Sequence, residues 1–190
     1  MTKRIALLCA CWTICSAGCD LFQTRDPDPP SQGTSCNATP DVYDVVLKNL
    51  SCAISEHNAD NYMRCFADPN LQQFVFEPSP EEQSKFTIWT LDSERRYFQN
   101  AMASLNGTPS FGDSIYNVIL SSGPPATATY SLKYVLFIPH LDPQAPKLVR
   151  GNMELYFRED SLHRWSMYRW VDNKTGPDST WSYLKAWFNR

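Results

Sequence analysis

Among the residues of this sequence, Glu94 and Tyr97 most resemble a catalytic pair. They lie three residues apart in the segment SERRYFQNAM, whose apolar residues recur at helical spacing, so both side chains would share one face of a helix. A carboxylate beside a phenol hydroxyl could supply the base and the oxyanion donor of proton-transfer chemistry. The competing interpretation is structural: a first-turn acid that stabilises the helix N-terminus, followed by a packed tyrosine.

Aromatic residues and one arginine accompany this pair. Arg169 is in phase with Trp165 and Met167 in an alternating strand, so it could point inward and pair with Glu94, whereas a local bulge would leave it exposed. Tryptophans and tyrosines on half-buried strands could line a small apolar cavity or simply form core. The candidate pocket-lining residues are Trp89, Glu94, Tyr97, Tyr134, Trp165 and Arg169. None of them is predicted to be catalytic.

Histidine and cysteine spacing argues against metal chemistry. His57, His140 and His163 have no nearby nucleophile, acid or ligand partner in a recognisable arrangement, and the sequence contains no CxxC motif. We therefore expect neither a metal site nor a cofactor. Cys52 and Cys65 are equally distant in sequence from the centre of the polar break at residues 57–60. An antiparallel helical hairpin would therefore place them side by side, where they could form a disulfide. Two buried thiols are the alternative.

The N-terminus predicts export and anchoring. A basic start, MTKR, precedes a short apolar run and the segment Ser16-Ala17-Gly18-Cys19, which together describe a signal peptide too short to span a bilayer. The last four residues resemble a bacterial lipobox, whose cysteine becomes the acylated first residue of the mature chain; the alternative is an ordinary secreted protein. The resemblance implies a lipoprotein signal peptide over residues 1–18, with palmitate-type acylation of Cys19. It places the protein in the bacterial cell envelope, lipid-anchored to a membrane and facing the periplasm.

Charge and composition define the rest of the mature chain. Loss of Lys3 and Arg4 with the leader lowers the basic count from 17 to 15 against 20 acidic residues, a net charge of −5. This balance argues against nucleic acid as a partner. Residues 19–39 are rich in proline and poor in apolar residues, which is typical of a tether, and residues 40–190 are long enough for one domain.

The apolar period changes along this domain from 3.6 to 2. Helical spacing predicts a helix that begins at Thr39-Pro40, a shorter one over residues 59–66 and a third over residues 92–105. Alternation then predicts strands over residues 113–121 and 126–138 and a long hairpin over residues 147–172, in which Gly151 marks a bulge or bend. A short C-terminal helix carries Trp181, Leu184, Trp187 and Phe188 on one face.

This order of elements resembles the nuclear transport factor 2-like superfamily, which includes ketosteroid isomerases. The resemblance covers about residues 40–172 and is sharpest at Leu50, Tyr62 and Phe66, at Trp89 and Glu94, and over residues 165–172 followed by Thr180-Trp181 and Leu184-Lys185. These motifs are similar to a lipoprotein branch of the superfamily. The implied fold class is α+β: a cone-shaped, curved antiparallel sheet wrapped on three N-terminal helices, with a short C-terminal helix and a pocket at its open end.

The functional expectation follows from the anchor and from the missing acid/base set. We expect a non-catalytic envelope module that binds a small apolar ligand or assembles with another envelope protein. An isomerase, cyclase or hydrolase of ketosteroid-isomerase-like type is the alternative. The resemblance is also compatible with a homodimer that pairs the outer sheet faces.

Overall fold

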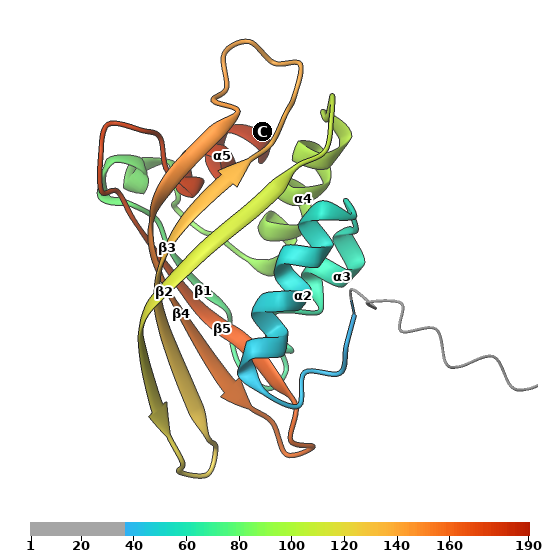
Figure 1. The fold of residues 1–190 in the computed structure, drawn as a ribbon, viewed down its shortest axis with the longest axis vertical. Helices are drawn as coiled ribbons and strands as arrows, with labels where there is room; N and C mark the ends of the chain where they lie inside the picture. Colours follow the sequence, from blue (N-terminus) through green and yellow to red (C-terminus); the bar gives the residue numbers. More distant parts are fainter. Residues whose placement is uncertain (1–36) are drawn as a thin grey trace, which may run out of the picture. The chain divides into compact units, whose positions relative to one another are not determined.

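The computed structural model describes residues 37–190. The predicted signal peptide, the acylated Cys19 and most of the tether lie outside the described residues. The elements in chain order are α2 (Tyr43–Ser55), α3 (Ala59–Met63), β1 (Val75–Glu77), the 3₁₀ helix η2 (Pro80–Lys85), α4 (Leu91–Ala103), β2 (Ser110–Ser121), β3 (Thr127–Phe137), β4 (Leu148–Glu159), β5 (Trp165–Asn173) and α5 (Trp181–Phe188) (Figure 1). The predicted α+β class, with three helices before the long strands, is confirmed.

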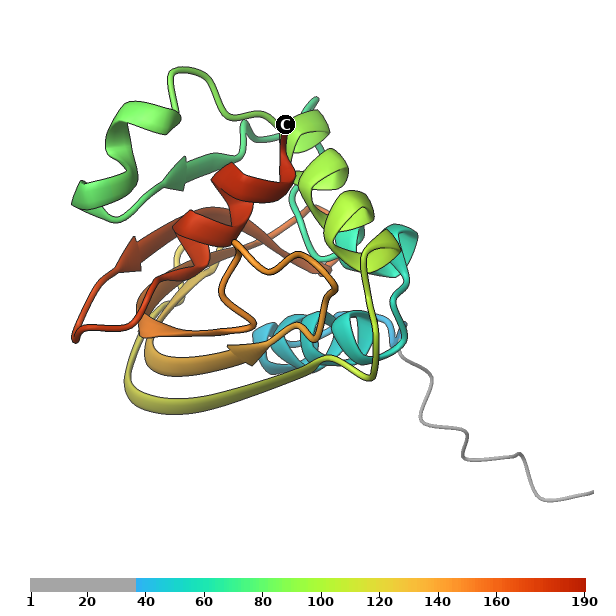
Figure 2. The same ribbon diagram turned by 90° about the horizontal axis from the view of Figure 1, so that it is seen from above.

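A single five-stranded sheet forms one layer of this part of the chain. Its strand order is β1-β5-β4-β3-β2, and all neighbours are antiparallel except β1 and β5, which pair in parallel. The sheet is curved and unclosed, with helices α2, α3 and α4 against one face and α5 across one end of it (Figures 1 and 2). The N-terminal helices and the C-terminal helix therefore enclose the concave side together.

Alternation in β3 and β4 places one apolar set inside, as predicted. Tyr130, Leu132, Tyr134 and Leu136 of β3 are buried, as are Val149, Met153, Leu155 and Phe157 of β4. The two strands pair in one uninterrupted register from Thr127 opposite Arg158 to Phe137 opposite Leu148. Because directly opposite residues share a face of the sheet, this register lines up both apolar sets against the helices.

Strand β5 changes phase in its middle. The pairing passes from Phe157 opposite Met167 to Tyr156 opposite Arg169, so Tyr168 is an extra residue in the strand. Such a bulge moves the following side chains to the other face. Arg169 consequently points outward, where its Nε donates to Glu77 at 2.7 Å, and the prediction that it lines the pocket is wrong.

Gly151 is required for close packing rather than for a bulge, since neither register shift in the sheet falls on it. A Cβ at this position would lie 2.7 Å from the Asn173 carbonyl oxygen and 2.8 Å from the Tyr134 hydroxyl oxygen. The strands can approach this closely only because residue 151 has no side chain.

We expect Gly151→Ala to lower the free energy of unfolding by about 1–3 kcal/mol, because the added methyl group must displace strand backbone and the buried Tyr134. Gly112→Ala in β2 is the matched control, since a Cβ there would meet nothing within 4 Å. Urea unfolding followed by tryptophan fluorescence measures both. Equal stabilities of the two variants would contradict this account.

The helices begin and end at different residues from those predicted. α2 begins at Tyr43 with Val42 as its N-cap, because the residues from Thr39 to Asp41 form a turn instead. α4 begins at Leu91, one residue before the predicted start, and is capped by Thr90, whose hydroxyl accepts from the Ser93 backbone N–H. α5 begins at Trp181 with Thr180 as its N-cap.

The predicted disulfide between Cys52 and Cys65 is wrong, because Cys65 is a free, buried thiol. The prediction placed Cys65 inside a helix over residues 59–66, but α3 ends at Met63. Cys65 lies beyond that end, with its carbonyl accepting from the Met167 backbone N–H of β5, while Cys52 lines a hollow together with Asp113 and Ile115 of β2. The two cysteines therefore lie near different strands. Burial raises the pKa of the Cys65 thiol to about 12.

In the described range, no helix has both the length and the apolar composition needed to cross a membrane.

Candidate functional site

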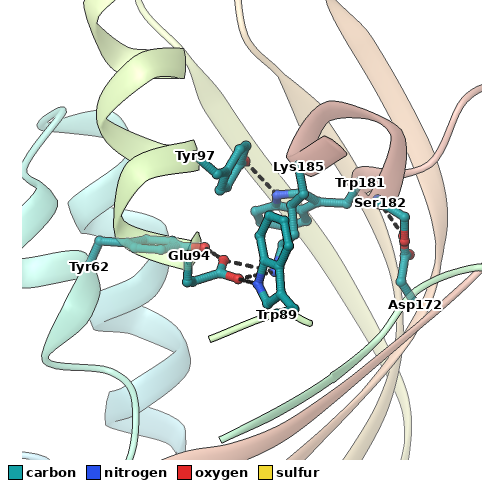
Figure 3. A network of polar contacts seen from close by, with 8 residues as sticks. All are labelled: Tyr62, Trp89, Glu94, Tyr97, Asp172, Trp181, Ser182 and Lys185. Atoms are coloured by element: carbon teal, nitrogen blue, oxygen red, sulfur yellow. Dashed lines mark hydrogen bonds and ion pairs between the residues drawn. The ribbon is translucent and has the colours of Figure 1, made fainter. Parts of the chain in front are cut away.

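Glu94 is the centre of a buried polar cluster on the concave side of the sheet (Figure 3). Its side chain has no exposed surface although it lies in the first turn of α4. One carboxylate oxygen, Oε1, accepts from the Tyr62 hydroxyl at 2.6 Å, and the other, Oε2, accepts from the Trp89 indole N–H at 2.6 Å. A buried carboxylate is costly unless it is paired, so these donors are part of the reason that it tolerates burial.

Lys185 of α5 completes the cluster. Its ammonium group lies 2.8 Å from Glu94 Oε1 and 2.9 Å from Oε2, and neither side chain is exposed. The same Nζ atom lies 3.8 Å from the ring centroid of Phe76 and 3.7 Å from that of Trp170. Aromatic faces attract a desolvated cation. The interior of the fold is thus filled by a lysine from the chain's own C-terminal helix, held between a carboxylate and two rings.

The titration of this cluster is shifted by burial. Desolvation lowers the pKa of Lys185, against the opposing attraction of Glu94 and of Asp172. Desolvation, followed by the charge of Glu94, raises the pKa of Tyr62 well above its usual value. The Tyr62 hydroxyl therefore remains protonated and acts as a hydrogen-bond donor.

A second buried carboxylate, Asp172, connects the sheet to α5. Its Oδ1 accepts from the Tyr134 hydroxyl at 2.7 Å, while Oδ2 accepts from the Ser182 backbone N–H at 2.7 Å and from the Ser182 hydroxyl at 2.5 Å. The Tyr134 hydroxyl in turn accepts from the Trp181 backbone N–H at 2.7 Å. Two backbone donors in the first turn of α5 are satisfied in this way, which is the role of a helix cap.

Burial also dominates the titration around Asp172. Desolvation raises the pKa of Asp172, although its bonds to Ser182 and Tyr134 and the charge of Lys185 oppose the shift. Desolvation and the neighbouring Asp172 carboxylate raise the pKa of Tyr134. Tyr97 has its pKa raised mainly by desolvation, and its hydroxyl accepts from the Trp181 indole N–H at 2.7 Å.

The structure brings together four of the six candidate pocket-lining residues. Trp89, Glu94, Tyr97 and Tyr134 surround the interior cluster, with Glu94, Tyr97 and Tyr134 buried. Trp165 lies elsewhere, against Tyr43 at a ring-centroid distance of 5.2 Å, and Arg169 is on the outer face. Glu94 is more than the first-turn acid of the structural interpretation, because three side chains donate to it.

Sequence analysis missed Lys185 and Asp172 as members of the cluster. Lys185 follows Trp181 by four residues, so helical spacing alone could have predicted that it lies on the apolar face of the C-terminal helix. Asp172 lies on the buried face because the bulge at Tyr168 shifts the phase of β5 before it.

A groove of about 1030 Å³ lies away from this cluster. It is formed by the turns that join β2 to β3 and β4 to β5, by the segment before α2 and by the chain after α3, at the end of the sheet remote from α5 (Figure 1). Apolar lining comes from Phe66, Leu71, Pro124, Ala126 and Trp165, and charged lining comes from Arg64, Arg158 and Arg164 and from Asp68, Glu159 and Asp160. A second, smaller hollow lies between α2 and β2, and neither hollow is lined by Glu94, Lys185 or Asp172.

Over the range that the structure covers, no three His, Cys, Asp or Glu side chains come together in a way that could hold a metal ion.

Three solved structures share this fold. The chain is similar to an NTF2-like protein of unknown function from Shewanella oneidensis, with 14% identity over 70% of this chain and 97% of that one and a TM-score of 0.50. A conserved protein from Planctomyces limnophilus matches at 11% identity over 68% and 91%, with a TM-score of 0.52. A candidate scytalone dehydratase from Novosphingobium aromaticivorans matches at 10% identity over 70% and 81%, with a TM-score of 0.50.

The protein has the nuclear transport factor 2-like fold, as the sequence resemblance implied. No protein-family model matches the sequence. No curated protein matches it either. At these identities the structural likeness defines the fold and leaves the activity to be argued from the site.

Proposed function

We propose that the protein is a membrane-anchored, non-catalytic binding module of the bacterial cell envelope, acylated at Cys19, whose ligand site is the groove rather than the interior of the fold. The observation that carries this proposal is Lys185, which occupies the interior beside Glu94 without any exposed surface. A substrate that used Glu94 as a base would first have to break this ion pair and displace α5. The anchor rests on the lipobox-like segment Ser16–Cys19.

The groove lining favours an amphiphile with an apolar body and an anionic head. Its apolar residues offer a surface to a hydrocarbon or ring system. Of its three arginines, Arg164 already pairs with Asp160, and the acidic Glu159 contacts His163. Within the described residues Arg64 and Arg158 have no acidic partner, and Arg158 donates only to the neutral Gln72. These two guanidinium groups could bind a carboxylate or a similar anion.

Calorimetric titration with octanoate tests the groove. The full chain is held in lipid nanodiscs, and the heat from empty nanodiscs is subtracted. We expect saturable binding that Arg158→Gln weakens about tenfold, because a charge-assisted hydrogen bond contributes about 1.5–3 kcal/mol. Arg150→Gln is the control, since Arg150 is an exposed strand arginine on the same β4 that pairs with Asp178 outside the groove. Absence of saturation, or equal affinity in both variants, would rule out the groove as the site of an anionic amphiphile.

A small-molecule isomerase, cyclase or hydrolase remains the alternative, and one observation favours it. Glu94 and Asp172 are buried carboxyl groups beside buried tyrosines, a combination that active sites also use. The fold is shared by a candidate dehydratase. Turnover of a ketone or enol substrate that is lost in a folded Glu94→Gln variant and kept in Asp178→Asn would replace the binding proposal with this one.

A further inference from the structure

Strand β2 has a long edge that no described strand covers. The sheet ends with β2 on one side and β1 on the other. β1 has only three residues, whereas β2 has twelve and pairs along its length with β3 alone among the described strands. An open edge presents a row of backbone N–H and C=O groups that can pair with another strand.

The free edge also lacks the usual protection against such pairing. From Ser114 to Ser121 the strand contains no charged residue and no proline. Its large apolar side chains are exposed: 43% for Val118, 60% for Ile119 and 57% for Leu120. Soluble proteins normally block long edge strands with lysine, proline or a bulge. The only bulge in β2 lies before Asn117, so the last five residues remain regular.

The pattern of this segment is self-complementary. Asn117, Ile119 and Ser121 lie opposite Ser131, Thr129 and Thr127 on one face of the sheet. Val118 and Leu120 lie opposite the buried Tyr130 and Ala128 on the other face, although both are themselves exposed. If two copies pair antiparallel about Ile119, directly opposite residues must share a face. Val118 then meets Leu120, Ile119 meets itself and Asn117 meets Ser121. Apolar residues meet apolar residues and polar residues meet polar ones.

We propose that two copies of the chain associate edge to edge through residues 117–121 of β2, in antiparallel register about Ile119. The two five-stranded sheets then form one continuous sheet. A second copy fits this edge because the register matches the strand to itself without placing any charge opposite another. Five paired residues are a normal length for a strand. This edge-to-edge association differs from the predicted pairing through the outer sheet faces. Pairing of those faces would bring together polar surface, such as the Arg169–Glu77 ion pair.

Cross-linking in membranes tests the register on the full chain. We expect Ile119→Cys to give a covalent dimer with a short bismaleimide, since the two Cβ atoms at the symmetry axis would lie about 4.5–5.5 Å apart. Val135→Cys is the matched control, because this β3 residue is also exposed, at 42%, but lies inside the sheet rather than at its edge. The unsubstituted chain controls for its own cysteines. A dimer from Val135→Cys and none from Ile119→Cys would overturn the proposal in favour of face-to-face pairing.

Charge substitution tests the association itself. Ile119→Lys places two like charges opposite each other and is expected to lower the co-purification of two differently tagged full-length copies about tenfold. A mixture of Ile119→Lys and Ile119→Asp copies should restore it, because opposite charges then meet. Val135→Lys should leave co-purification unchanged, and the circular dichroism spectrum of Ile119→Lys should stay that of the parent, since Ile119 is exposed and its replacement leaves the fold intact. Full co-purification of Ile119→Lys copies, or none with the parent chain, would overturn the proposal.

Discussion

Replacing Lys185 with methionine is expected to lower the free energy of unfolding by about 3–5 kcal/mol, because it leaves Glu94 as a buried charge without its cation. Tyr62 and Trp89 would still donate to the carboxylate, but neither neutralises it. Methionine keeps much of the volume of the lysine stem, so the loss reports charge rather than a cavity. Urea unfolding monitored by circular dichroism at neutral pH gives the difference.

A double variant separates the ion pair from packing. Adding Glu94→Gln to Lys185→Met removes the unpaired charge, and about half of the lost stability should return, since the amide oxygen can still accept from Tyr62. Arg95→Met is the matched control for an ion pair. Arg95 contacts Asp60 at 2.8 Å on the surface, and its loss should cost about 0–1 kcal/mol. If Lys185→Met were no more harmful than Arg95→Met, the interior pair would not hold the fold together.

The experiment also bears on function. The interior beside Glu94 and Tyr97 is occupied by Lys185 and Trp181 of α5. If Lys185→Met folds and binds octanoate like the parent chain, the groove and the interior cluster are independent. The cluster is then a structural core, and the binding function lies at the other end of the sheet.

The sheet could be predicted wherever its strands are regular. In β3 and β4 the alternation of apolar residues is unbroken, so the buried face follows directly from the sequence. In β5 the prediction fails after Tyr168, because a bulge has no reliable sequence signal when the inserted residue is itself aromatic. This bulge explains the error at Arg169, which was included among the pocket-lining residues: of the two alternatives that the sequence offered, the bulge that leaves Arg169 exposed is the one observed.

The candidate site was less predictable than the sheet. Glu94 and Tyr97 could be paired because helical spacing relates them locally. The partners that define their chemistry come from distant segments: Tyr62 of α3 and Lys185 of α5 contact Glu94, and Trp181 of α5 donates to Tyr97. Spacing within one element carries no information about such contacts. The helical pattern did indicate an apolar face on the C-terminal helix, but not that Lys185 would be buried with those apolar residues.

The junction between β5 and α5 supplies the second large effect. We expect Asp172→Ala to lower the free energy of unfolding by about 3 kcal/mol, because it removes the acceptor of three hydrogen bonds and leaves buried donors of Ser182 and Tyr134 unsatisfied. The backbone N–H of Ser182 in α5 should then lose protection from hydrogen exchange before the backbone N–H groups of the sheet do. Asp178→Ala is the matched control, since Asp178 is exposed and its contact with Arg150 is 3.4 Å long, and it should change stability by less than about 0.5 kcal/mol.

The stability difference between the parent chain and Asp172→Ala depends on pH because the pKa of Asp172 is raised in the folded state. In the unfolded chain Asp172 releases its proton near pH 3.8, whereas in the folded chain it keeps the proton to a higher pH. The free energy of unfolding of the parent chain therefore falls as the pH rises from about 3.8 through the raised pKa of Asp172. Asp172→Ala lacks this step, so the stability gap between parent and variant should narrow as the pH rises through that window. Urea unfolding at a series of acidic pH values measures the gap. A gap that widens with pH would show that the folded state prefers the ionised carboxylate, and that the hydrogen bonds and Lys185 outweigh burial at this site.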